Sequence, residues 1–173
     1  MQIRCALVGM PGSGKSTVGR HLAQRLKVPF IDLDHQLEQV LKTSIRQFFE
    51  AEGEARFRDI EAQVLAKVTA RPGGMVLSTG GGAVLRPENR QVLRDFGNVL
   101  YLRASPEEIF KRVKHDRTRP LLQVNNPLQK LRELYAQRDA LYRDAATYVI
   151  ETGRPTVQTL VNMIMMQLEM APP

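Results

Sequence analysis

Residues 9–16 read Gly9-Met-Pro-Gly-Ser-Gly-Lys15-Ser16, and they follow directly on the apolar run Ile3–Val8. The spacing is Gly-x4-Gly-Lys-Ser, the phosphate-binding P-loop, and it stands where such a loop belongs, between a buried strand and a helix. Four specified positions in this context set the motif apart from an ordinary glycine-rich turn. The sequence therefore predicts that the chain binds a nucleoside triphosphate together with Mg2+.

The residue types of the loop match the chemistry of a polyphosphate. Gly12 and Gly14 allow tight turns and let backbone N–H groups approach phosphate oxygens closely. The helix that begins near Lys15 adds the positive end of its dipole. Lys15 is expected to reach the β- and γ-phosphates, and the Ser16 hydroxyl is the expected Mg2+ ligand. Thr17 is expected to support the start of the helix rather than to bind the metal.

Length and composition are those of one globular domain. The chain has 173 residues, of which 43% are hydrophobic and 25% charged, so we expect a single domain over residues 1–173 with a substantial core. The one cysteine, Cys5, lies in the first apolar run and is expected to be a small core residue. No apolar run approaches the length of a membrane span, and the first strand begins at once. The chain is therefore expected to be cytoplasmic, without a signal peptide or a membrane partner.

The net charge of +7 raises the alternative of nucleic-acid binding. Part of the excess lies in the run Lys111-Arg112-Val-Lys114-His115-Asp-Arg117-Thr-Arg119. Such a run fits a basic patch for nucleic acid, a solvated helix end, or a clamp on an anionic substrate. Beside a P-loop the clamp explains the arginines most economically, so no nucleic-acid partner is expected.

Short apolar runs alternate with longer helical patterns along the chain. The expected strands are Ile3–Val8, Phe30–Leu33, Met75–Ser78, Val99–Leu102 and Tyr148–Ile150. The segments between them are long enough for helical crossovers. We therefore expect an α/β fold with a parallel sheet of about five strands and helices on both faces.

Local signals mark two helix starts. Ser44-Ile-Arg-Gln47 fits a capping box that opens a helix through Phe48 and Phe49. Ser105-Pro106-Glu107-Glu108 combines a cap, a proline at the first helical position and acids in the first turn.

Two further patterns invite a function but are expected to be structural. Asp95-Phe96-Gly97 copies the metal-binding motif of protein kinases without its partner motifs, and Gly97 is expected to end a helix. A methionine cluster lies near the C-terminus, at Met163, Met165, Met166 and Met170. It is expected to pack adaptably in the core, the alternative being a partner surface.

Two carboxylates follow the second strand, in Phe30-Ile-Asp32-Leu-Asp34. Strand alternation puts Asp32 and Asp34 on the same side. In an open parallel sheet the carboxyl ends of the strands face the ligand crevice. One carboxylate is then available to the water shell of Mg2+ and the other to an attacking hydroxyl. The alternative is that Asp34 caps the next helix.

The third strand is followed by Thr79-Gly80-Gly81-Gly82. Many P-loop proteins carry an acid at the end of this strand to assist Mg2+, but Met75–Ser78 has none. This shifts the metal role to Asp32, with Ser78 as a helper through water. The glycines predict a ligand lying against bare backbone, the alternative being a flexible loop.

Two arginines occur in helical patterns. Arg58 and Glu61 are one turn apart and can meet on one face, as in many surface ion pairs. Arg138 shares a helix with Leu134 and Leu141, which places it at the edge of the core. Neither arginine by itself indicates a site.

Taken together, the motifs resemble those of the shikimate kinase family. The matching segments are Gly9–Thr17, Asp32-Leu-Asp34, Phe48…Gly53-Glu54…Phe57-Arg58…Glu61, Thr79-Gly-Gly-Gly82, Arg119-Pro-Leu-Leu122 and Arg138…Leu141-Tyr142. They are collinear over nearly the whole chain. The family phosphorylates the 3-hydroxyl of shikimate with MgATP in aromatic amino-acid biosynthesis. The resemblance thus implies that reaction, ATP and shikimate as substrates, Mg2+ as cofactor, and a three-layer P-loop kinase fold like that of adenylate kinase.

The resemblance also implies a role for each matched position. The implied catalytic residues are Asp34 as the base, Lys15, and Arg119 as a lid arginine. The implied ATP-binding residues are Gly12, Ser13, Gly14, Lys15, Ser16, Thr17, Arg112, Arg119, Arg154 and Pro155. The implied substrate-binding residues are Asp34, Arg58, Gly80, Gly81, Gly82 and Arg138. Arg58 and Arg138 would hold the carboxylate, and Ser16 and Asp32 would hold the metal. A mobile acceptor-binding region, about 33–61, and a lid, about 112–125, follow from the same resemblance.

Other interpretations stay open at this point. The nearest is another kinase of the same architecture with gluconate or a nucleoside monophosphate as acceptor, since arginines bind phosphate and carboxylate alike. A non-catalytic nucleotide switch is a rival of another class, although the chain has no Asn-Lys-x-Asp guanine-reading motif. The chain is expected to be a monomer.

Overall fold

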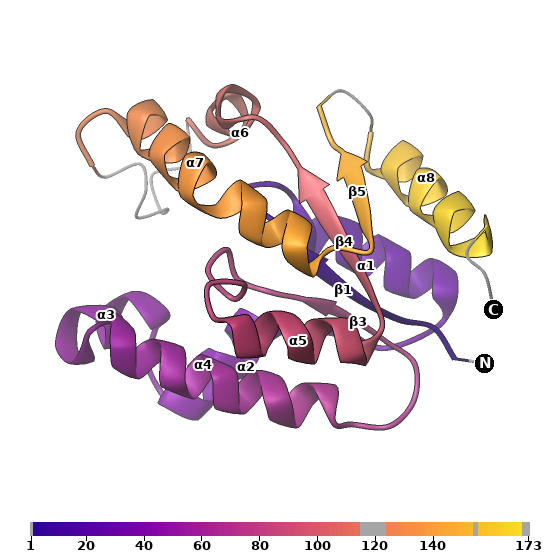
Figure 1. The fold of residues 1–173 in the computed structure, drawn as a ribbon, viewed down its shortest axis with the longest axis horizontal. Coiled ribbons are helices and arrows are strands. Elements are labelled where there is room, and N and C mark those ends of the chain that lie inside the picture. The colour runs from indigo at the N-terminus through magenta and orange to yellow at the C-terminus, as the bar shows by residue number, and fades with distance from the viewer. Residues whose placement is uncertain (1, 115–123, 154–155, 171–173) are drawn as a thin grey trace.

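The computed structural model describes residues 2–114, 124–153 and 156–170. In this part of the chain one sheet of five parallel strands has the order β2-β3-β1-β4-β5 (Figure 1). The strands are β1 (Arg4–Val8), β2 (Phe30–Asp32), β3 (Met75–Ser78), β4 (Asn98–Arg103) and β5 (Tyr148–Glu151). The expected parallel sheet is confirmed, and every expected strand is found within one residue of its expected ends.

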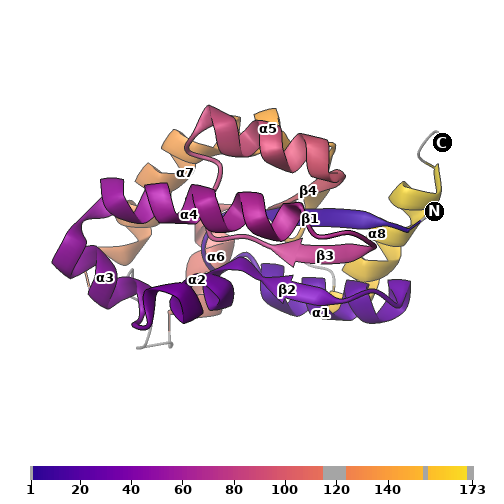
Figure 2. The same cartoon turned by 90° about the horizontal axis from the view of Figure 1, so that it is seen from below.

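Helices cover both faces of the sheet, which gives three layers (Figure 2). Alternate residues of the central strand β1 face opposite layers, as strand geometry requires. Cys5 and Leu7 join one core cluster with α1 (Lys15–Leu26) and α8 (Val157–Met170). Ala6 and Val8 join a larger cluster on the other face. Its principal helices are α4 (Glu54–Thr69), α5 (Pro87–Phe96) and α7 (Pro127–Ala145).

The remaining helices lie toward the carboxyl ends of the strands. They are α2 (Leu33–Leu41), α3 (Ile45–Glu52) and α6 (Pro106–Val113). Figure 1 shows α3 at one extremity of the molecule, beyond the sheet. Among the described helices, α3 alone has no fully buried side chain, and it rests on aromatic contacts such as Phe49 with Phe57, whose ring centroids are 4.7 Å apart. The helix is therefore held by few interactions.

The capping predictions are confirmed in their main part. Ser44 accepts a hydrogen bond from the Gln47 N–H at 3.1 Å and opens α3. The reciprocal half of the box is not formed, because the Gln47 side chain accepts from the Thr43 hydroxyl at 2.6 Å instead. Ser105 caps α6 by accepting from the Glu108 N–H at 3.1 Å, and Gly97 ends α5 as expected.

The prediction that the methionines pack in the core is wrong for three of the four. Met165 packs against the sheet-facing cluster, but the exposed fractions are 39% for Met163, 60% for Met166 and 78% for Met170. The buried stripe of Leu160, Val161 and Ile164 already covers the sheet, which leaves the opposite face of α8 to solvent. None of the helices described is long and apolar enough to cross a membrane.

Candidate active site

The P-loop lies between β1 and α1, as the sequence predicts. Gly12 and Gly14 adopt positive φ angles of 83° and 92°, a backbone region that glycine reaches without steric cost. Gly14 is the N-cap of α1 and offers no side-chain acceptor, and the first turn holds no acid. The N-terminal N–H groups of α1 are therefore left to an anionic ligand. The buried Lys15 Nζ donates to the Gly9 and Met10 carbonyls at 2.8 Å each, which holds its charge against the loop.

Ser16 and Asp32 meet at the end of β2. The Ser16 hydroxyl donates to Asp32 Oδ2 at 3.1 Å. These are hard oxygen donors, and Mg2+ in nucleotide sites characteristically binds one or two protein oxygens, water and phosphate. No cluster of three or more acidic, histidine or cysteine ligands occurs among the described residues. The residues present thus fit a nucleotide-bound Mg2+ better than a metal held by protein alone.

The two aspartates reach the site in a different way from the one expected. Asp34 lies in the first turn of α2, not in the strand, so strand alternation does not place it. The helix cap is Asp32, whose Oδ1 accepts from the Asp34 N–H at 3.0 Å, so the alternative that Asp34 is the cap is wrong. The turn from β2 into α2 nevertheless brings both carboxylates to one cavity.

That cavity has a volume of about 280 Å3. The P-loop, both aspartates and the end of β3 line it, through Pro11, Gly12, Gly14, Lys15, Ser16, Thr17, Asp32, Asp34, Ser78, Thr79, Gly80 and Gly81. Thr17, expected to support the helix start and implied by the resemblance to bind ATP, is part of this lining. Burial and the neighbouring Asp32 charge raise the pKa of Asp34 to about 6, against the opposing charge of Lys15. The Asp34 carboxyl therefore titrates close to neutrality.

The three glycines after β3 allow close packing against functional side chains. A Cβ on Gly80 would approach Asp34 Oδ1 to 2.8 Å, and a Cβ on Gly81 would approach Pro11 Cδ to 2.6 Å. A Cβ on Gly82 would overlap the Arg58 guanidinium. The loop must be bare backbone for these contacts to exist.

Arg58 and Glu61 form a buried pair rather than a surface salt bridge. Arg58 Nη1 donates to Glu61 Oε1 at 2.8 Å, and the Glu61 side chain is 1% exposed. Burial raises the pKa of Glu61, and the Arg58 charge opposes that shift. The rings of Phe49 and Phe57 lie 5.7 and 5.1 Å from the Arg58 guanidinium carbon. These contacts fix the guanidinium beside the glycine loop.

Arg138 of α7 approaches the same region. Its charge acts on both Glu61 and Tyr142, as does that of Arg58. The buried Nε atoms of Arg58 and Arg138 make no hydrogen bond in the described part of the protein, although Arg58 Nε lies 3.5 Å from the Glu54 carboxylate. Buried donors are nearly always paired, so the two guanidinium groups are suited to an anionic ligand.

Tyr142, named in the sequence only as the end of the matching segment Arg138…Leu141-Tyr142, lies beside the glycine loop. Its hydroxyl donates to the Gly81 carbonyl at 2.6 Å. The available signal was chemical, since a buried tyrosine hydroxyl needs a partner. Its partner could not be read from the helix pattern alone.

Arg112 connects the P-loop to the segment after β5. Its guanidinium donates to the Ser13 carbonyl at 3.3 Å and to the carbonyl of Thr152. Arg112 and Ser13, two expected nucleotide-binding residues, are thus brought together. Arg119, Arg154 and Pro155, also expected at the nucleotide, lie outside the described residues, as does most of the expected lid.

Known proteins of one family resemble this chain over nearly its whole length. The family model for shikimate kinase matches residues 11–169. A shikimate kinase of Paracidovorax citrulli is 58% identical over 172 residues, 98% of this chain and 94% of that protein. A shikimate kinase of Ralstonia nicotianae is 56% identical over 164 residues, 95% of this chain and 86% of that protein.

Solved structures are similar over the same extent. A shikimate kinase from Acinetobacter baumannii in complex with shikimate gives a TM-score of 0.92 at 44% identity, covering 98% of this chain and 94% of that one. A gluconokinase from Sinorhizobium meliloti gives 0.63 at 17% identity, covering 96% and 91%, a likeness of fold alone. The family model and these relatives, together with the P-loop and the arginine pair, show that the chain belongs to the shikimate kinase family.

Proposed function

We propose that this protein transfers the γ-phosphoryl group of ATP to the 3-hydroxyl of shikimate, in aromatic amino-acid biosynthesis. One observation carries the assignment of acceptor. Next to the P-loop cavity and the bare backbone of Gly80–Gly82, the buried Nε atoms of Arg58 and Arg138 make no hydrogen bond in the described part of the chain, although the Arg58 guanidinium is also paired with Glu61. Two guanidinium groups and free N–H groups form a binding site suited to a carboxylate, and shikimate is a carboxylate with ring hydroxyls.

The nucleotide half of the mechanism follows from the P-loop. Gly12, Ser13, Gly14 and Thr17 place backbone and side-chain donors around the phosphates. Lys15 exchanges its bonds to loop carbonyls for the β- and γ-phosphates and stabilises charge on the group in transfer. Ser16 and Asp32 would hold a Mg2+ ion, which when bound neutralises phosphate charge and aligns the γ-phosphate.

The acceptor half depends on Asp34. Its carboxylate orients the attacking hydroxyl toward the γ-phosphate and accepts the proton as the new O–P bond forms and the bond to the ADP oxygen breaks. Because phosphoryl transfer has a loose transition state, alignment contributes more than strong basicity. Gly80, Gly81 and Gly82, with Arg58 and Arg138, hold the acceptor in that alignment.

The remaining roles rest on the family resemblance. Arg112 flanks adenine together with Arg154 and Pro155, and Arg119 closes over the phosphoryl group. Residues of about 33–61 and 112–125 close over the two substrates and exclude water. The whole chain works as one monomeric domain in the cytoplasm.

The test is release of ADP from ATP, measured in parallel with shikimate, gluconate, AMP and no acceptor. We expect shikimate-dependent turnover that needs Mg2+ and stops in EDTA. Turnover with gluconate or AMP instead would show that the protein is a kinase but would reject shikimate as its acceptor. Equal slow hydrolysis in every sample would favour a nucleotide switch.

A further inference from the structure

Tyr142 contacts two of the elements assigned to the acceptor. Its side chain is fully buried, and its hydroxyl donates to the Gly81 carbonyl at 2.6 Å. The positive charge of Arg138 lies near the same hydroxyl, where it opposes the rise that burial causes in the pKa of Tyr142. A phenolic hydroxyl has one proton to donate and lone pairs to accept with, so one oxygen can join the glycine loop to the arginine.

The bond to Gly81 has a consequence for the peptide that follows. A trans peptide is planar, so its carbonyl and the next N–H point in opposite directions. Holding the Gly81 carbonyl on Tyr142 therefore directs the Gly82 N–H away from Tyr142. None of the N–H groups of Gly80–Gly82 donates to a backbone carbonyl in the described part of the chain. Their directions are thus set by few contacts, of which the Tyr142 hydroxyl is one.

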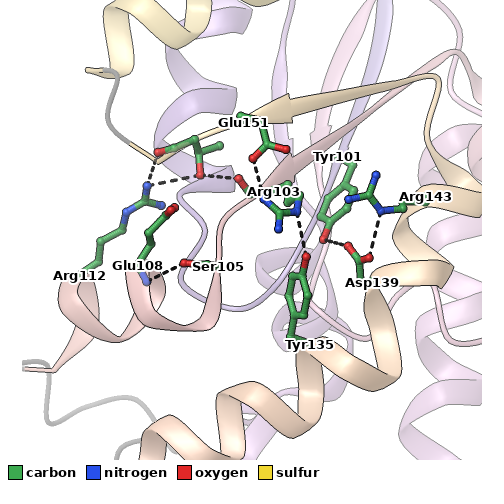
Figure 3. Close-up of polar contacts among 10 residues, drawn as sticks. Tyr101, Arg103, Ser105, Glu108, Arg112, Tyr135, Asp139, Arg143 and Glu151 are labelled. Carbon is green, nitrogen blue, oxygen red and sulfur yellow. Dashed lines mark hydrogen bonds and ion pairs between the residues drawn. The ribbon is translucent and has the colours of Figure 1, made fainter.

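The helix that carries Tyr142 is itself fastened to the sheet. The Tyr101 hydroxyl donates to Asp139 at 2.7 Å, and Arg103 Nε donates to the Tyr135 hydroxyl at 2.9 Å. Figure 3 shows these contacts joining β4 to successive turns of α7. Tyr142 continues this series by one turn, but its hydroxyl bonds to the glycine loop instead of to the strand.

We propose that Tyr142 is a positioning residue, whose hydroxyl orients the Gly81–Gly82 peptide and the Arg138 guanidinium for the acceptor carboxylate. The proposal rests on the proposed function, since it deepens the account of the acceptor site. The hydrogen bond of Tyr142 goes to Gly81 and its ring packs on Tyr101, so neither interaction involves the P-loop or Asp34. Loss of the Tyr142 hydroxyl should therefore weaken binding of the acceptor and leave the phosphoryl-transfer step unchanged.

The chain supplies a matched control in Tyr101. The rings of Tyr101 and Tyr142 pack together with centroids 5.0 Å apart, and both side chains are fully buried. The Tyr101 hydroxyl, however, bonds to Asp139 and not to the glycine loop. Tyr101→Phe and Tyr142→Phe thus remove the same group from the same aromatic pair, one beside the acceptor residues and one at the strand.

The experiment measures steady-state kinetics of the wild type and both variants with shikimate and with its methyl ester. We expect Tyr142→Phe to raise the KM for shikimate about tenfold, the effect of one lost hydrogen bond to a charged site. The KM for ATP and kcat at saturating shikimate should stay within about twofold. The KM for the uncharged ester should change much less, because the ester lacks the carboxylate that Arg138 binds. Tyr101→Phe should leave all of these values near those of the wild type.

If Tyr142 had a purely structural role, Tyr142→Phe would raise the KM values for shikimate and its ester alike, or Tyr142→Phe and Tyr101→Phe would have equal effects. Either result would overturn the proposal. A readout independent of turnover separates this failure from failure of the proposed function. In the ligand-free protein, Tyr142→Phe should shift the Gly82 amide resonance, and Tyr101→Phe should not. An unchanged Gly82 resonance rejects the positioning role. A wild type without shikimate turnover rejects the function whatever the resonance does.

Discussion

Asp34 shows how a single carboxyl is adapted to its place. The transition from β2 into α2 puts it in a partly closed cavity beside a second carboxylate, Asp32. Burial and that like charge raise its pKa to about 6, although the nearby Lys15 charge opposes the shift. Keeping the Asp34 carboxyl ionised in the folded protein therefore lowers the free energy of unfolding.

Replacing Asp34 by asparagine should therefore stabilise the ligand-free, metal-free protein. The folded state holds the Asp34 proton more tightly than the unfolded state does, with pKa values of about 6 and 3.8. The wild type consequently loses stability as the pH rises through that window. At pH 7.5 in EDTA, we expect Asp34→Asn to unfold in urea with a free energy about 3 kcal/mol higher than that of the wild type. Below about pH 4 the difference should vanish. A variant less stable than the wild type at pH 7.5 would contradict the shift.

The same substitution should abolish most of the activity. An amide cannot accept the proton of the attacking hydroxyl, so kcat should fall by about 100-fold or more. Binding of ATP, followed by titration calorimetry, should remain nearly unchanged, since Asp34 lies on the acceptor side. Near-normal turnover would reject Asp34 as the base.

At the scale of elements, α3 is the segment most exposed to local opening. It has no fully buried side chain, and Ser44 supplies its one side-chain cap. Elements with few buried contacts open at free energies below that of global unfolding. Among the described helices, α3 is therefore the one we expect to open most readily, and it lies within the proposed acceptor-binding region.

Ser44→Ala should weaken this helix selectively. Loss of the cap costs about 1 kcal/mol, which corresponds to about fivefold faster amide hydrogen exchange over residues 45–52. The KM for shikimate should rise more than the KM for ATP. Ser105→Ala, which removes the same kind of cap from α6, is the control, and it should leave exchange in α3 unchanged. Equal acceleration throughout the chain would mean that α3 opens only with the whole protein.

At the scale of the whole molecule, strand order brings the site together. With β1 at the centre and β3 beside it, the carboxyl ends of parallel strands carry the P-loop and the glycine loop to one edge. Cys5 lies within the central strand and is completely buried. Burial raises the pKa of its thiol to about 12, so the native protein presents almost no thiolate.

Labelling of Cys5 by a disulfide reagent should therefore report global unfolding. We expect slow modification at pH 8 under native conditions and rapid modification in urea. Shikimate with ADP, a pair that cannot react, at about 100 times their dissociation constants should slow the labelling about 100-fold or more. A Cys5→Ala variant provides the blank. Rapid labelling that substrates do not affect would mean that the central strand opens locally.

Local patterns in the sequence were enough to predict the helices, the strands and the candidate residues at the strand ends. The P-loop, the five strands and the helix starts at Ser44 and Ser105 depend on spacing, capping and turns among near neighbours. Those interactions are local, so the pattern of residues is enough to predict them.

The tertiary structure alone decided which side chains meet and which faces are covered. The Arg58–Glu61 pair looked like a surface bridge until Phe49, Phe57 and the glycine loop enclosed it. Tyr142 and Gly81 are 61 residues apart, and no local pattern encodes their hydrogen bond. The exposed methionines of α8 are apolar residues that stayed in solvent, because other residues of the same helix already cover the sheet. Contacts between distant segments depend on how the layers pack, and packing is a property of the whole chain.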